Sequence, residues 1–186
     1  MIILYGVIAV FIAWIWVDYF RLIDIFEKER LIYFIPTFIL GGIAVLTVVA
    51  LNQIRLSKIN FNVNGEYIND FLYCFLNIGI VEELAKLIPF VIIYLLFKKQ
   101  FSEPIDYFVF ICISALGFAA VENTMYFNEH GAIIINNRAI LSTVGHMFDT
   151  SLIAYGIVKY KFQPGKNRIY ILGLYFFFAA LSHAIY

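Results

Sequence analysis

Two adjacent glutamates, Glu82 and Glu83, lie with Lys86 inside an apolar run that covers residues 71–97. An acidic or basic side chain at the centre of a membrane-spanning helix costs about 2.5–3.5 kcal/mol, so three in one run indicate a function that needs them. Glu82 and Lys86 are four residues apart and can pair along one helix face, whereas Glu83 is turned away by about 100°. The spacing predicts that Lys86 can pair with Glu82 and that Glu83 need not share this partner, so one carboxylate is held in place while the other stays free to react or to bind an ion. The alternative is an ion pair that only locks two helices together.

Three later apolar runs also contain polar side chains that are costly to bury. They are Glu122, Asn123 and Tyr126 in the first of these runs, His146 and Asp149 in the second, and His183 in the third. These residue types can bind metal ions, transfer protons and donate hydrogen bonds.

The ionisable residues of the four runs share one depth. Depth is counted from the predicted cytoplasmic end of each span, at about 1.5 Å per residue. Glu82 and His183 then both lie roughly 22 Å above that end, Glu122 lies roughly 27 Å above it and His146 roughly 18 Å above it. A bilayer core is about 30 Å thick, so all four fall in its outer half. Separate structural ion pairs have no reason to share a level. The sequence therefore predicts one shared site.

The residue types at this level suit hydrolysis. Glu122, His146 and His183 form a two-histidine, one-carboxylate ligand set that fits Zn²⁺ with an open position for water, and Glu82 or Glu83 then serves as general base. Without a metal, a carboxylate can activate the water directly while the imidazoles stabilise the oxyanion. Both mechanisms remain open, because no spaced metal-binding signature is present.

The neighbouring polar residues have supporting roles in either mechanism. Lys86 is expected to be the structural partner of an acid. Asn123 and Tyr126 are either hydrogen-bond donors behind the ligands or packing groups, and Asp149 is placed one turn from His146, where it can orient the imidazole.

Six helices must position these residues within one membrane domain. The chain is 63% hydrophobic and 14% charged, against about 45–50% apolar and 25% charged in globular proteins, which indicates a polytopic all-α membrane bundle. The predicted transmembrane helices cover residues 2–20, 31–51, 67–97, 104–127, 139–158 and 169–186 of the single domain 1–186. The first is interpreted as a span and not as a removed signal peptide, because no basic segment precedes it.

The Lys and Arg residues in the segments that link the predicted helices predict the orientation of the protein in the membrane. The odd-numbered links hold nine Lys and Arg residues and the even-numbered links hold three, so the odd links should face the cytoplasm and both termini the outside. Arg138, at the outer mouth of the fifth span, is expected to be an interfacial anchor. The 13 basic and 13 acidic residues cancel, and no basic face for nucleic acid is expected.

The order of the motifs resembles the PrsW family of intramembrane proteases, within the CAAX prenyl endopeptidase and bacteriocin-processing superfamily. The resemblance rests on Glu82-Glu83-x-x-Lys86, on Phe118-x-x-x-Glu122-Asn123-x-x-Tyr126, and on one histidine in each of two later spans, His146 and His183. It covers residues from about 71 to the C-terminus. By position, it implies that Glu82, Glu83, Glu122, His146 and His183 are catalytic or ligating.

The resemblance implies a protease of the bacterial plasma membrane that cuts a single-pass membrane protein, such as an anti-sigma factor, near its extracytoplasmic side. It leaves the choice between a metal-dependent and a glutamic mechanism open. Two other functions compete with this interpretation. One is an ion-coupled transporter that uses the same acids and histidines, and the other is a non-catalytic membrane chaperone or immunity protein.

Overall fold

The structure is a computed structural model that describes residues 1–23, 29–56, 61–163 and 169–185, and these residues form helices and no strand. This confirms the predicted all-α membrane bundle. The main helices are α1 (Ile2–Ile23), α2 (Leu31–Leu56), α3 (Tyr67–Tyr73), α4 (Ile80–Leu96), α5 (Pro104–His130), α6 (Ile135–Asn137), α7 (Thr143–Phe162) and α8 (Ile169–Ile185). Short helices connect them: π-helical η1 (Cys74–Gly79) and η4 (Arg138–Ser142), and 3-10 helical η2 (Lys98–Gln100) and η3 (Ala132–Ile134).

Helix length and composition bear on the predicted spans. In the described part of the chain, α1, residues Leu31–Gln53 of α2, and α5 are long and apolar enough to cross a membrane, and α8 is a shorter apolar helix. The predicted span 67–97 coincides with consecutive α3, η1 and α4, and 139–158 coincides with most of η4 and α7. The count of six spans stays a prediction. Four of the basic residues counted for the orientation lie outside the described residues: Lys28, Lys58, Lys166 and Arg168.

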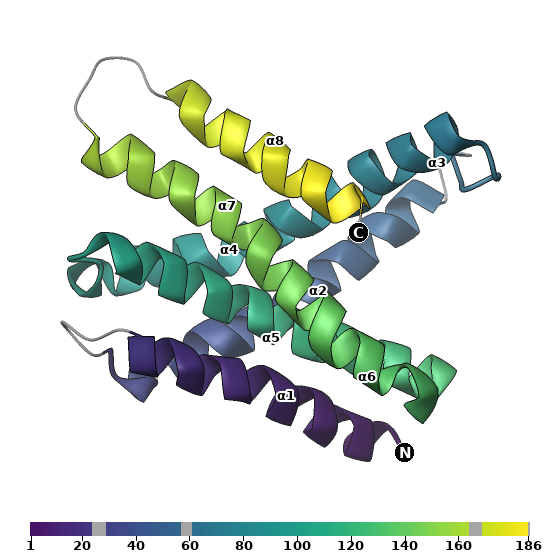
Figure 1. The fold of residues 1–186 in the computed structure, drawn as a ribbon, viewed down its shortest axis with the longest axis horizontal. Coiled ribbons are helices and arrows are strands. Elements are labelled where there is room, and N and C mark those ends of the chain that lie inside the picture. Colours follow the sequence, from purple (N-terminus) through teal and green to yellow (C-terminus); the bar gives the residue numbers. More distant parts are fainter. Residues whose placement is uncertain (24–28, 57–60, 164–168, 186) are drawn as a thin grey trace.

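Helix α5 is the centre of the bundle, with α1, α2 and α7 packed around it (Figure 1). Its contact with α2 depends on residues without side chains. A Cβ at Gly117 would clash with the backbone oxygen of Phe38, and a Cβ at Gly41 with that of Ser114. Small residues let two membrane helices approach at backbone distance, where dispersion contacts hold them together. This close crossing fixes the depth of α5 relative to α2.

The N-terminus of α5 is capped by residues at the start of the helix itself. Pro104 occupies the first helical turn, where its missing N–H leaves no donor unsatisfied. The Asp106 carboxylate accepts a hydrogen bond from the backbone N–H of Glu103 at 2.6 Å. At the other end, Gly131 adopts a φ of 76°, which favours glycine and stops the helix.

Helices α7 and α8 run side by side, and α8 also packs against η1 (Figure 1). The contact with η1 is close, because a Cβ at Gly79 would clash with the backbone oxygen of Ala180. Helices α4, α7 and α8 therefore meet near the end of α8, and α5 closes the fourth side. The four helices that contain the predicted site residues are thereby brought to one place.

Candidate functional site

The buried ion pair of the site joins Lys86 to Glu83, and not to Glu82 as the spacing predicted. Lys86 Nζ lies 2.6 Å from Glu83 Oε1, and both side chains are fully buried. Residues three and four apart are both neighbours on a helix, so either glutamate was within reach. Glu83 Oε2 also accepts a hydrogen bond of 2.9 Å from Thr150 on α7, which fixes this carboxylate toward the interior. One carboxylate is thus held and the other is not, as expected, but the held one is Glu83.

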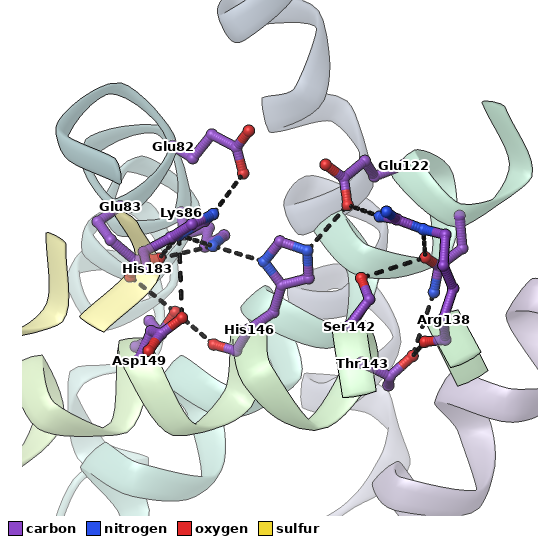
Figure 2. A network of polar contacts seen from close by, with 12 residues as sticks. Glu82, Glu83, Lys86, Glu122, Arg138, Ser142, Thr143, His146, Asp149 and His183 are labelled. Carbon is purple, nitrogen blue, oxygen red and sulfur yellow. Dashed lines mark hydrogen bonds and ion pairs between the residues drawn. The ribbon is translucent and has the colours of Figure 1, made fainter. Parts of the chain in front are cut away.

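The imidazole of His183 lies between the two glutamates (Figure 2). Its Nδ1 is 2.9 Å from Glu83 Oε1, and its Nε2 is 3.4 Å from Glu82 Oε2. With the proton on Nδ1, the ring donates to Glu83 and leaves the lone pair of Nε2 on the side of Glu82. With the proton on Nε2, the ring faces Glu82 as a donor and Nδ1 faces Lys86 Nζ, which is 3.5 Å away. Glu82 Oε2 is buried and has no hydrogen-bond partner among the described residues. In the first tautomer, two electron-rich atoms face each other, an arrangement that a cation would stabilise.

The imidazole of His146 is held at both ring nitrogens. Nε2 lies 2.9 Å from Glu122 Oε2, and Nδ1 lies 2.8 Å from Lys86 Nζ. An ammonium only donates, so in the neutral ring Nδ1 accepts from Lys86 and Nε2–H donates to Glu122. Asp149, which was expected to orient this ring, has its Oδ2 4.0 Å from Nδ1 of His183 instead. The orientation of His146 is therefore fixed by Glu122 and Lys86.

Arg138 belongs to the site, which the sequence interpretation missed. Its Nη2 lies 2.5 Å from Glu122 Oε2 (Figure 2). Its Nε donates to Asn123 Oδ1 at 2.8 Å. Its guanidinium also lies 3.7 Å from the ring centroid of Tyr126. The expectation of an interfacial anchor is wrong, because η4 folds this residue back onto α5. In the sequence, Arg138 follows Asn136 and Asn137 just before the predicted fifth span. This position makes it a candidate for the site, but spacing alone does not reveal which acid it contacts.

Asn123 and Tyr126 support the site from α5. Asn123 is buried, and its amide donates to Thr143 Oγ1 at 3.1 Å while its oxygen accepts from Arg138. Tyr126 contributes the aromatic face beneath the Arg138 guanidinium. Both residues thus position the arginine, which in turn contacts Glu122.

A polar cavity of about 330 Å³ opens beside these side chains. It is lined from α2, α3, η1, α4, α5, η4, α7 and α8, by Asn52, Tyr73, Cys74, Asn77, Ile78, Glu82, Glu122, Tyr126, Arg138, Ser142, His146, His183 and Ala184. Glu82, Glu122, His146 and His183, which the sequence placed at one depth, therefore share one cavity. Glu83 and Lys86 lie behind it.

The donor set fits a divalent metal ion. Ligand atoms of Glu82, His146 and His183 lie within 4.8 Å of one another, and so do those of an overlapping group, Glu83, Asp149 and His183. One carboxylate and two imidazoles are typical ligands of Zn²⁺ at a site with an open position. The unpartnered oxygen of Glu82 beside the Nε2 lone pair of His183 supports the first group. The ligand role predicted for Glu122 remains a prediction.

Formal charge supports the same conclusion. The site contains four carboxylates, namely Glu82, Glu83, Glu122 and Asp149, with only the permanent cations Lys86 and Arg138 contacting them in the described structure. With all four carboxylates ionised and both imidazoles neutral, two negative charges would be left, and a divalent cation would balance them.

Comparisons with known proteins agree with this chemistry. Residues 29–186 match the model of a family described as PrsW family intramembrane metalloprotease. The chain is 31% identical over 172 residues to Protease PrsW of Clostridioides difficile, covering 89% of this chain and 68% of that protein. It is 27% identical over 170 residues to Protease PrsW of Bacillus subtilis, covering 91% of this chain and 74% of that protein. No solved structure matches the chain significantly.

The family match extends over most of the chain, including every residue of the cavity wall. Motif order, buried ionisable residues and overall similarity therefore lead to one conclusion. The chain belongs to the PrsW family of intramembrane metalloproteases.

Proposed function

We propose that this protease cleaves a single-pass membrane protein inside the bilayer, near the extracytoplasmic side, at the cavity lined by Glu82, Glu122, His146 and His183. Family membership already favours an enzyme over an ion-coupled transporter or a non-catalytic chaperone or immunity protein. The single observation that carries the assignment of the site is the buried, unpartnered oxygen of Glu82 opposite His183 Nε2.

Glu82, His146 and His183 would hold the metal, and Zn²⁺ suits this donor set best. When bound, such an ion supplies a Lewis acid that polarises water and a carbonyl group. Glu83 holds Nδ1 of His183, and Glu122 holds Nε2 of His146. Carboxylates in these positions fix the tautomer and the orientation of a ligating imidazole. For His146, the lone pair left for a ligand is that of Nδ1, which Lys86 contacts in this structure.

Glu122 is our candidate for the general base. It lines the cavity, and its side chain is 17% exposed, against 0% for Glu83. It takes a proton from the attacking water and returns it to the leaving amine, while the oxygen of the water forms the new bond to the carbonyl carbon. The Arg138 guanidinium at 2.5 Å keeps this carboxylate in place between the two transfers. The reverse assignment, with Glu122 as ligand and Glu82 as base, predicts that Glu122→Gln and not Glu82→Gln loses the metal.

The substrate would reach the cavity from the lipid. Figure 1 shows α3 and the end of α2 diverging from α6 and the start of α7, and the cavity is lined by residues from both groups of helices. A helical segment hides its peptide bonds in its own hydrogen bonds, so the cleaved segment must unwind locally before water can attack. A segment that can unwind in this way lies near the end of a membrane span. An anti-sigma factor with one span and an extracytoplasmic domain is a substrate of this class.

The experiment is co-expression of the chain with candidate single-pass membrane proteins, followed by detection of a shortened product. Glu82→Gln, Glu122→Gln and His183→Ala should each abolish the product while the protein remains folded and inserted. Lys99→Gln, outside the site, is the matched control and should leave cleavage unchanged. Normal cleavage by the three site variants would disprove the assignment. Labelling of cysteines placed in the links from the outside would test the predicted orientation of the termini.

A further inference from the structure

The π-helical stretch η1 (Cys74–Gly79) forms one wall of the cavity. In a π-helix the backbone hydrogen bonds span five residues, and such turns occur mainly as single bulges, frequently at functional sites. Cys74, Asn77 and Ile78 of η1 line the cavity together with Glu82, which follows in α4. The extra residue of the bulge rotates the side chains before it relative to those of α4. The bulge therefore brings side chains of α3 and η1 to the same cavity as the acid.

The position of η1 is fixed by α8. Gly79 lies against the backbone of Ala180 so closely that a Cβ would clash with its carbonyl oxygen. His183 lies three residues beyond Ala180 on the same helix, so the contact sets the spacing between η1 and the imidazole. Side chains of η1 are thus held in a defined relation to the proposed metal ligands.

Asn77 has a buried polar atom without a partner. Its Nδ2 finds no hydrogen-bond acceptor among the described residues. A buried donor without a partner is unfavourable, because it has lost its water and gained nothing in exchange. Most such groups in folded proteins are satisfied, and one that lines a cavity is a candidate for a ligand. Asn77 itself lines the cavity, so its amide can meet a substrate bound there.

The two charged donors of the site are already engaged. Lys86 donates to Glu83 and His146, and Arg138 donates to Glu122 and Asn123. Peptide hydrolysis places negative charge on the carbonyl oxygen, and an uncommitted donor near that oxygen stabilises the transition state. We infer that the Asn77 amide donates a hydrogen bond to the carbonyl oxygen of the scissile peptide. This inference rests on the proposed function and makes Asn77 a catalytic residue.

The test uses the 186-residue chain in lipid nanodiscs. Its substrate is a fluorescence-quenched membrane-spanning peptide with a Gly-Ser-Gly segment near its outer end. Asn77→Leu, which removes the donor at similar size, should lower kcat by about 10²–10³-fold with little change in KM. Asn77→Ser, which keeps a donor, should recover part of this loss. Leu76→Ala is the control, because Leu76 is in the same bulge but 47% exposed, and it should cleave normally.

A second measurement does not depend on turnover. Asn77→Leu replaces an unpartnered buried donor by an apolar group, so its thermal midpoint without substrate should rise above that of the wild type. Wild-type kcat in Asn77→Leu, or a lowered thermal midpoint in both Asn77 variants, overturns the inference and leaves the proposed function intact. If the wild-type chain itself leaves the peptide uncut while still binding zinc, the proposed function on such segments fails and the inference fails with it.

Discussion

Replacement of Glu82 by glutamine, compared with the same change at Glu122, decides which acid binds the metal and which moves the proton. Both changes keep the size of the side chain and remove its negative charge. Glu82 shares a group of close ligand atoms with both histidines, whereas Glu122 contacts His146 Nε2 at 2.9 Å and Arg138. The two variants should therefore fail in different ways.

The roles assigned to the two glutamates set the expected size of each effect. Loss of an outer partner of a metal ligand lowers metal affinity by about 10–100-fold, so Glu122→Gln should weaken zinc binding by no more than this. Loss of a ligand should exceed that range, so Glu82→Gln should weaken it by more than ~100-fold, or about 2.7 kcal/mol. Removal of a general base lowers kcat by about 10²–10⁴-fold, which is the effect expected of Glu122→Gln at saturating zinc.

The metal-free proteins supply an independent check. In Glu82→Gln the new amide can donate to His183 Nε2, which is 3.4 Å from Glu82 Oε2 in the wild type. The metal-free variant should therefore be more stable than the metal-free wild type by about 0.5–1.5 kcal/mol. No such gain is expected for Glu122→Gln, because it weakens the contact with Arg138.

The assay combines metal content after dialysis against graded chelator, single-turnover cleavage at saturating zinc, and thermal unfolding with and without metal. Zinc retained by Glu82→Gln and lost by Glu122→Gln would refute the assignment and establish Glu122 as the ligand. Full activity in chelator, with no stoichiometric metal in any variant, would refute metal binding and support the glutamic mechanism.

Three further predictions concern the fold and the metal. Lys86→Met should lower the free energy of unfolding by about 3–5 kcal/mol, because Glu83 is left buried without its cation, and thermal unfolding measures the loss. Gly117→Ala should destabilise the chain by about 1–3 kcal/mol or more through its clash with Phe38, whereas Gly173→Ala, which meets nothing within 4 Å, should be neutral or stabilising. Zinc at about 100 times its Kd should raise the free energy of unfolding by about 2.7 kcal/mol, and a chelator should reverse the rise; an unchanged midpoint would argue against a site in the folded protein.

The membrane character and helical class of this chain were determined by its sequence. Apolar runs of about 20 residues are the local requirement for crossing a bilayer, and backbone groups in lipid must be satisfied within a helix. The predicted runs coincide with helices within a few residues, apart from the third and fifth, which contain or begin with π-helical stretches. The bulges at Cys74–Gly79 and Arg138–Ser142 could not be predicted, because they depend on packing against neighbouring helices.

The grouping of the site residues was also determined by the sequence. Costly side chains at a common depth in four helices have to meet, since none of them is stable facing lipid. Glu82, Glu122, His146 and His183 do line one cavity. Depth along a helix follows from counting residues, so this part of the prediction needed no tertiary information.

Only the tertiary structure decided which side chain pairs with which. Lys86 lies one turn from both glutamates, and Thr150 on α7 and His183 on α8 fix Glu83 as its partner. Arg138 joins the site because η4 turns it toward α5. Rotation of each helix about its own axis sets these choices. That rotation is determined by side-chain packing between helices far apart in the sequence, which residue spacing within one helix does not encode.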